Sequence, residues 1–208
     1  MHWVFKSKNP HGNVVFNFSH NAIEDLAHFA KGYHRAGKHL AEKLAASRGY
    51  ADFDGYPILF LYRHALELYM KAIAYRGAQL LQMLDMETLD TSKLFKLHRP
   101  LLLLPGIKIV FEGIGWTWDT EIPGARNLDE FAKLICGIEE IDPESYCFRY
   151  PINTKGQAAL NHHTIINVVE FSRNMDPILD LLEAAALGLH EEFDTTAEAK
   201  FELQKILG

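Results

Sequence analysis

The stretch that most constrains the fold of this chain is residues 56–75, which read YPILFLYRHALELYMKAIAY. Only Arg63, His64, Glu67 and Lys71 among them are charged or titratable near neutral pH. A helix that is apolar nearly all round is buried, either inside a bundle or across a membrane. At about 100° per residue, the four polar side chains share one stripe, roughly a quarter of the circumference wide. This stripe favours the central helix of a soluble bundle over a membrane span.

The spacing of the stripe allows one carboxylate to serve two cations. Glu67 lies four residues after Arg63 and four before Lys71, and such i,i+4 pairs attract on a helix. One interpretation is a satisfied internal salt-bridge network, with Arg149 as an outside partner of Glu67. The other is a ligand or active site, in which Arg63 and Lys71 bind a phosphate, His64 acts as acid or base, and Arg149 joins them. The sequence leaves both interpretations open.

A second long helix is predicted over residues 22–47, antiparallel to one over 56–84 that has Pro57 in its first turn. Its apolar residues recur at three- and four-residue intervals: Ile23, Leu26, Ala30, Tyr33, Ala36, Leu40 and Leu44. The opposite face carries basic residues: His28, Lys31, Arg35, Lys38 and His39. Such a run is usually a solvated face. The alternative is a phosphate or RNA contact, for which Arg35 and His39 are the candidates.

Two further helices complete a predicted up-down bundle of about four to five main helices. They cover residues 127–138 and 163–189. Pro177 should kink or break the second of these, and Gly188 should end it. Residues 191–208 then form a separate acidic and amphipathic tail, which docks on its own bundle or on a partner chain.

The segments between these helices are predicted to be irregular. Residues 1–20 form an arm packed on a single domain that covers residues 1–190. Residues 106–125 hold two tryptophans among glycines, which predicts an aromatic-rich insertion without regular structure. Strands at 146–150 and 157–163 can form a short β-hairpin.

Composition limits the classes of function. The chain has 208 residues, enough for one good core, and is 48% hydrophobic and 23% charged, as is ordinary for a globular protein. Its net charge of −6 makes it a poor generic binder of the nucleic-acid backbone. Cys136 and Cys147 are its only cysteines, which fits a reduced, cytoplasmic protein. The first residues contain no long apolar run of the kind found in signal peptides.

The histidines do not form a metal-binding pattern. None of the eleven belongs to a His-Glu-x-x-His motif, and neither His34/His39 nor His162/His163 has the spacing that places two ligands on one helix face. A glycine-rich phosphate loop and a nucleophile elbow are absent as well. The sequence therefore predicts no metal and no cofactor.

Two segments carry a resemblance to a known family. The helix YPILFLYRHALELYMKAI resembles the signature helix of HEPN-type proteins (higher eukaryotes and prokaryotes nucleotide-binding helical bundles), which often read Arg-His-x-x-Glu-x-x-x-Lys there. The segment IDPESYCFRYPINTKGQ at 141–157, called the FRYP segment below, is similar to one that follows such helices in some uncharacterised bacterial members. A less specific piece, KLHRPLLLL, is also similar, and the resemblance spans roughly residues 20–185.

The resemblance implies an all-α HEPN-like bundle that forms a homodimer. Ribonuclease members carry an arginine, four to six residues and then a histidine. No arginine of this chain has that spacing, and Arg35–His39 is one residue too close. This departure favours a non-catalytic interaction or ligand-sensing module. The alternative is a HEPN-type endoribonuclease or RNA-binding protein in stress or phage defence, with RNA or a nucleotide as its partner. Whether the protein is an enzyme stays open.

Overall fold

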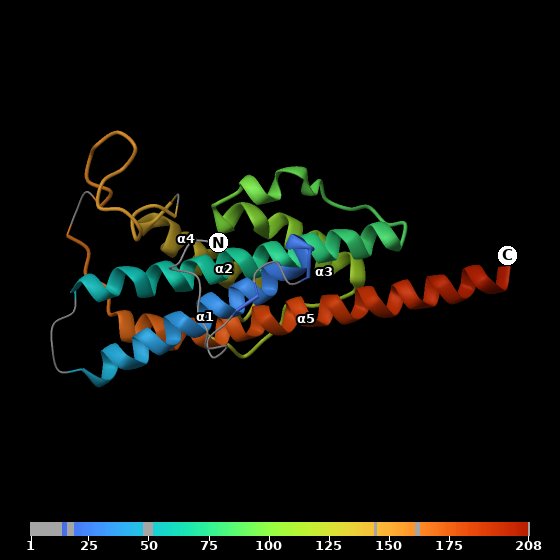
Figure 1. The fold of residues 1–208 in the computed structure, drawn as a ribbon, viewed down its shortest axis with the longest axis horizontal. Coiled ribbons are helices and arrows are strands. Elements are labelled where there is room, and N and C mark those ends of the chain that lie inside the picture. Colours follow the sequence, from blue (N-terminus) through green and yellow to red (C-terminus); the bar gives the residue numbers. More distant parts are fainter. Residues whose placement is uncertain (1–13, 16–18, 48–51, 144, 161–162, 208) are drawn as a thin grey trace, which may run out of the picture.

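The computed structural model describes residues 14–15, 19–47, 52–143, 145–160 and 163–207 (Figure 1). Almost all of its regular structure is helical, which confirms the predicted all-α bundle. The helices in chain order are α1 (Ala22–Ala46), α2 (Asp52–Met83), the 3-10 helices η2 (Thr91–Lys96) and η3 (Pro100–Leu103), α3 (Leu104–Ile114), α4 (Leu128–Ile141) and α5 (Val168–Leu207). The predicted arm at residues 1–20 lies largely outside the described residues.

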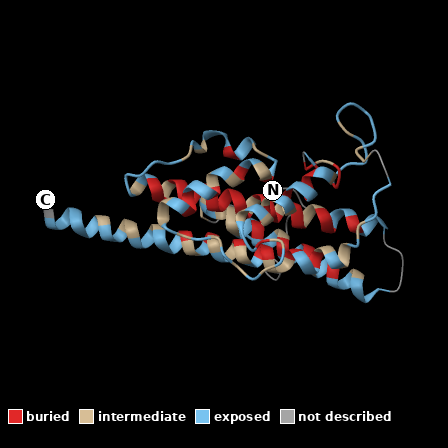
Figure 2. Cartoon of the chain, turned by 180° about the vertical axis from the view of Figure 1, so that it is seen from behind, coloured by how far each residue is buried: buried red, intermediate tan, exposed pale blue. Residues whose placement is uncertain are grey.

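Helix α2 is the centre of the bundle, as its composition predicts. It contacts α1, α5, α3 and both 3-10 helices, and buried residues run along most of its length (Figure 2). Gly77 lets α3 approach closely, because a Cβ at this position would lie 2.2 Å from Val110 Cγ1. The helix already includes Asp52, so Pro57 lies inside it rather than in the first turn as predicted. The helix continues through Pro57 with the loss of one backbone hydrogen bond, to the carbonyl of Phe53.

The buried side of α1 differs in part from the prediction. Its fully buried residues are Ala30, His34, Gly37 and Ala41. Ala36 and Leu40, which the periodicity places in the core, are exposed. The reason is tertiary: α2 packs at Gly37, where a Cβ would lie 3.0 Å from the Tyr62 ring. Helix α5 covers the side of α1 that carries His34. The packing of α2 and α5 therefore decides which face of α1 is buried. Apolar spacing alone predicts a face that is shifted by about one residue.

Helix α5 runs without interruption through two residues predicted to stop it. Pro177 lies inside the helix, and Ile178 and Leu179 beside it are fully buried. This packing outweighs the one hydrogen bond that a proline removes. Gly188 serves packing rather than termination, because a Cβ there would lie 2.8 Å from Trp116 Cη2. The predicted tail at 191–208 is therefore no separate helix: its described residues are the end of α5, which extends beyond the bundle (Figure 1).

The predicted irregular insertion at 106–125 begins with helix α3. The helix ends at Gly115, whose φ of 74° is in the left-handed region that glycine tolerates. The irregular part that follows is fixed by Trp118. Its ring stacks on Phe131, with ring centroids 4.8 Å apart, and its Nε1 donates to the carbonyl of Ala125 at 2.8 Å. Aromatic burial thus orders the segment, as expected. The segment nevertheless begins with a helix, which the glycines in the sequence did not predict.

The predicted β-hairpin is reduced to one antiparallel bridge, between Ile152 and Ala158, in the part of 146–163 that the structure describes. Residues 146–150 cannot extend as a strand because they form a turn, in which the N–H of Arg149 donates to the carbonyl of Tyr146 at 3.0 Å. Residues 161–162 of the second predicted strand lie outside the described residues. No described helix has the length and apolar character that crossing a membrane requires.

Candidate functional site

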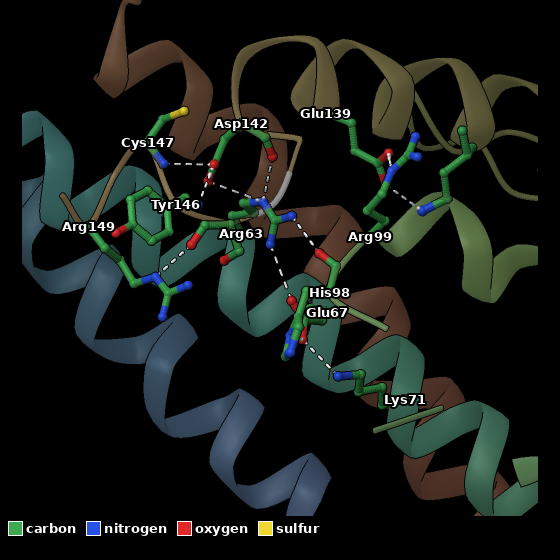
Figure 3. A network of polar contacts seen from close by, with 12 residues as sticks. Arg63, Glu67, Lys71, His98, Arg99, Glu139, Asp142, Tyr146, Cys147 and Arg149 are labelled. Carbon is green, nitrogen blue, oxygen red and sulfur yellow. Dashed lines mark hydrogen bonds and ion pairs between the residues drawn. The ribbon is translucent and has the colours of Figure 1, made fainter. Parts of the chain in front are cut away.

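The polar stripe of α2 forms a buried charge network (Figure 3). Glu67 Oε2 lies 3.2 Å from Arg63 Nη1, and Glu67 Oε1 lies 2.8 Å from Lys71 Nζ. Arg63 is 0% exposed, and the other two side chains are also buried. Both predicted i,i+4 pairs are therefore present in a low-dielectric interior, where an unpaired charge would be costly.

Backbone carbonyls and a second carboxylate occupy the other donors of the two cations. Arg63 Nη2 donates to the carbonyl of His98 at 2.7 Å, and its Nε donates to the carbonyl of Asp142 at 3.3 Å. Lys71 Nζ donates to the carbonyl of Phe95 at 3.3 Å. Every nitrogen of the Arg63 guanidinium thus has a partner. This arrangement fits an internal salt-bridge network better than an open binding site for a phosphate.

Asp142 is a member of the network that the sequence analysis missed. It follows α4, and its Oδ1 accepts hydrogen bonds from the backbone N–H groups of Tyr146 at 2.6 Å and Cys147 at 2.9 Å. Its Oδ2 lies 3.4 Å from Arg63 Nε, an ion pair that is not aligned as a hydrogen bond. Asp142 therefore fastens the FRYP segment to the central helix. The Asp-Pro pair at 142–143 is a turn signal that could have indicated it.

His98, not Arg149, is the outside partner of Glu67. Its Nδ1 lies 3.1 Å from Glu67 Oε1, and its side chain is 62% exposed, so it covers the network from solvent. Burial alone would raise the pKa of Glu67. The hydrogen bond and charge of Lys71, the contact with His98 and the charge of Arg63 outweigh burial and hold that pKa below its ordinary value. Glu67 is consequently ionised at neutral pH.

Arg149 lies on the surface of the FRYP segment. Its Nε donates to the carbonyl of Ser145 at 2.6 Å. Its guanidinium carbon lies 5.6 Å from the ring centroid of Phe60 and 5.6 Å from that of Tyr150. The prediction that Arg149 pairs with Glu67 is wrong, because the turn after Asp142 directs Arg149 towards the first turns of α2 instead.

His64 is the member of the stripe that does not join the network. Its ring stacks on Phe60, with centroids 5.4 Å apart, and meets the ring of Tyr33 edge-on at 4.6 Å. Burial lowers the pKa of His64; the charge of Glu67 opposes this, and the charges of Arg149, Lys71 and Arg63 lower it further. His64 is therefore neutral at pH 7.

These contacts form one continuous row of side chains, which we call the ring row. Its members in order are Tyr33, His64, Phe60, Arg149, Tyr150 and Tyr146. It joins α1, α2 and the FRYP segment, which lie far apart in the sequence. Tyr150 and Arg149 are exposed and the others are partly exposed, so the row is accessible from solvent. The row was not predicted from the sequence, because aromatic residues at these positions are usually interpreted as part of the hydrophobic core.

The other two predicted candidates, Arg35 and His39, are exposed on α1 and have no described contact with the network or the ring row. Two lysines of the same helix pair with α5 instead. Lys31 Nζ lies 2.5 Å from Glu183 Oε1, and Lys38 Nζ lies 3.4 Å from Asp176 Oδ2. The predicted basic face is therefore partly neutralised at the surface between α1 and α5.

A cavity of about 450 Å³ lies between the end of α1 and the starts of α2 and α5. Its lining is mostly apolar and includes Leu59, Phe148 and Val168, with Asp52 as its charged residue. An apolar wall with a carboxylate does not suit an anionic ligand. Among the described residues, no three or more His, Cys, Asp or Glu side chains gather as metal ligands.

Comparisons with protein-family models, with curated proteins and with solved structures found no match for this chain. The fold and the site therefore define its class by themselves. It is an all-α bundle with a buried network of paired charges and an accessible row of aromatic and cationic side chains.

Proposed function

We propose that the protein is a non-catalytic, HEPN-like ligand-sensing module that holds a nucleotide, or a nucleotide unit of single-stranded RNA, on the ring row. The observation that carries this proposal is the position of Arg149 beside two aromatic rings, those of Phe60 and Tyr150. Its Nε bonds to the Ser145 carbonyl, and within the described structure its two terminal nitrogens have no hydrogen-bond partner. A guanidinium held in this way can donate two parallel hydrogen bonds to a phosphate.

The rings beside Arg149 supply the second part of nucleotide recognition. A base stacked on an aromatic side chain gains about 1–3 kcal/mol, and the ring centroids of Tyr150 and Phe60 each lie 5.6 Å from the guanidinium carbon. Arg149 supplies the positive charge of the row, because within the described structure it forms no ion pair, whereas Arg63 and Lys71 are paired with carboxylates. With a net charge of −6 the whole chain does not attract an extended polyanion, so we expect one or two phosphates to be bound.

Binding is best measured by fluorescence anisotropy with a labelled mononucleotide and a labelled short single-stranded RNA. Arg149→Ala and Tyr150→Ala should each weaken binding by about tenfold, the loss of roughly 1.4 kcal/mol. Arg173→Ala is the matched control, since Arg173 is an exposed arginine on α5 whose one described ion pair is with Glu170. Absence of binding by the wild type, or equal losses in all three variants, would refute the proposal.

RNA cleavage is the second candidate, and one observation favours it. His64 is neutral at pH 7 and lies next to Phe60, against which Arg149 also packs, so its imidazole could accept a proton near a bound phosphate. The same RNA incubated with the protein and separated on a gel distinguishes the two. Cleavage abolished by His64→Gln identifies a nuclease, and intact RNA with measurable binding supports the sensing module.

The proposal also includes a cytoplasmic location. Two features support it: Cys136 and Cys147 are both free thiols, as is usual in a reducing compartment, and nucleotides and RNA are abundant there.

A further inference from the structure

The end of α5 carries an apolar stripe that its own bundle does not cover. Thr196, Ala199, Leu203 and Ile206 recur at three- and four-residue intervals and so share one side of the helix. Leu203 is 56% exposed and Ile206 is 78% exposed. We call these four residues the tail stripe. The last turns of α5 extend beyond the other helices (Figure 1).

The tail stripe lies next to the side of α5 that packs on the bundle. That side ends at Phe193, which lies under the guanidinium of Arg76 at 4.4 Å, and at Lys200, whose Nζ is 3.2 Å from Asp85. At about 100° per residue, Leu203 and Ile206 are rotated roughly 60° and 120° from Lys200. The exposed apolar residues of this stripe form a candidate contact surface for another molecule.

We propose that a second copy of the chain covers the tail stripe, with the two α5 ends packed antiparallel. The charges of this segment select the direction. Residues 191–198 contain four acids and no lysine or arginine, whereas residues 199–206 contain Lys200, Lys205 and one acid, Glu202. The first half thus carries a net charge of −4 and the second half a net charge of +1. Antiparallel packing places unlike halves together, and parallel packing would place −4 against −4.

The tail stripe is also self-complementary in this arrangement. A two-fold axis near Ala199 places Thr196 of one copy opposite Leu203 of the other, so a small side chain meets a large one on both sides of the axis. Alanine at the axis allows the two helices to approach closely. The stripe is only a few turns long, so the dimer should be weak, with a dissociation constant on the order of micromolar.

Sedimentation velocity over a range of protein concentrations tests the proposal on the full chain. Leu203→Glu should weaken dimerisation by at least about tenfold, because it places a carboxylate in the covered stripe. Phe201→Glu is the matched control: Phe201 is 59% exposed, close to Leu203 in the sequence, but on the opposite side of α5. It should change the dissociation constant by less than about twofold. A monomeric wild type at high micromolar concentration, or equal losses in both variants, would overturn the proposal.

Cysteine cross-linking tests the direction independently. In a Cys136→Ser background, Ala199→Cys should form a disulfide-linked dimer on oxidation, since the axis brings the two Cβ atoms within the roughly 3.5–4.5 Å that a disulfide needs. Thr196→Cys should not, because antiparallel packing separates the two copies of residue 196. Efficient cross-linking through Thr196→Cys would show parallel packing and contradict the proposal. Neither experiment depends on nucleotide binding, so failure here leaves the proposed function untouched.

Discussion

Glu67 is the residue on which the polar interior of this bundle depends. It is buried, and it receives contacts from Arg63, Lys71 and His98. The carboxylate compensates two buried cations at once, and these cations in turn hold the backbone carbonyls of the segments packed on α2. A change at this residue therefore affects several segments together.

We expect Glu67→Gln to lower the free energy of unfolding by about 3–5 kcal/mol, because it leaves buried cations without their carboxylate. Urea denaturation measures the loss. Glu170→Gln is the control, since it breaks an exposed pair with Arg173 and should cost no more than about 1 kcal/mol. An equally small effect at Glu67 would mean that Arg63 and Lys71 do not rely on it, and that the stripe is open to an anion after all.

An apolar replacement should recover part of this stability, but the structure sets a condition. Arg63→Met with Glu67→Leu removes the ion pairs of Arg63 with Glu67 and Asp142 and the pair of Lys71 with Glu67, so it leaves both Asp142 and Lys71 buried without a partner of opposite charge. We therefore expect substantial recovery only when Asp142→Asn and Lys71→Met are added, since the amide oxygen of the asparagine can still accept from the backbone N–H groups of Tyr146 and Cys147. Full recovery by the double variant alone would contradict this assignment of Asp142.

His64 should make stability depend on pH. Its pKa in the folded protein lies below the ordinary 6.5, so the unfolded chain takes up the proton first as the pH falls. The stabilisation is present above pH 6.5 and is lost as the pH falls from there through the folded-state pKa. Urea denaturation from pH 8 to 5 should thus show a decline that is smaller in His64→Gln, with His28→Gln, an exposed histidine of α1, as control. Equal slopes in all three proteins would refute the assignment.

At the scale of elements, α5 shows how packing overrides local stop signals. Pro177 and Gly188 are both typical of helix ends, yet α5 contains both. Neighbouring side chains provide the reason: Ile178 and Leu179 are buried beside the proline, and Trp116 lies against the glycine. The glycine in α5 is thus required by the tryptophan, not by the backbone.

Gly188→Ala should consequently destabilise the protein although alanine favours a helix. The added Cβ would lie 2.8 Å from Trp116 Cη2, and the indole is held edge-on against Phe111, with ring centroids 5.5 Å apart. Gly137→Ala in α4 is the matched control: no atom outside its own helix backbone lies within 4 Å of a Cβ there, so it should gain about 0.5–1 kcal/mol. Thermal unfolding measures both. If the two substitutions shift Tm in the same direction, the contact with Trp116 does not explain Gly188.

At the scale of the whole molecule, a second polar cluster joins the three long helices. Asp176 of α5 accepts a hydrogen bond from Tyr62 Oη of α2 at 2.6 Å, and His34 Nε2 of α1 lies 2.9 Å from the same oxygen. Burial, together with the hydrogen bond to Asp176 and its charge, raises the pKa of Tyr62, so the phenol stays protonated as a donor. The relative positions of α1, α2 and α5 are fixed by this cluster as well as by apolar packing.

Tyr62→Phe should lower the free energy of unfolding by about 1–3 kcal/mol, because Asp176 loses a buried donor while the ring is kept. Tyr56→Phe, at an exposed position near the start of α2, should have almost no effect. Urea denaturation followed by circular dichroism measures both variants. Equal stability of Tyr62→Phe and the wild type would show that the His34 and Lys38 contacts suffice for Asp176.

Features set by interactions between residues close in the sequence could be predicted, and features set by contacts between distant segments could not. The central helix, the i,i+4 pairs of Glu67 and the all-α class follow from periodicity over a few turns, and these predictions are confirmed. The family, the function and the homodimer stay predictions. The continuity of α5 and the helix at the start of the 106–125 segment could not be predicted, because glycine and proline act locally while their neighbours in space decide the outcome.

The sequence by itself determined which side chains must leave water: a helix with one polar stripe has to be buried, and its charges have to pair. Only the tertiary structure decided which groups complete those pairs. Asp142 reaches Arg63 and His98 reaches Glu67 from segments more than thirty positions away, and Arg149 and Tyr33 contact the neighbouring rings of Phe60 and His64 on α2. Such contacts depend on how helices pack, and packing is set by the shapes of all facing side chains together rather than by any one of them.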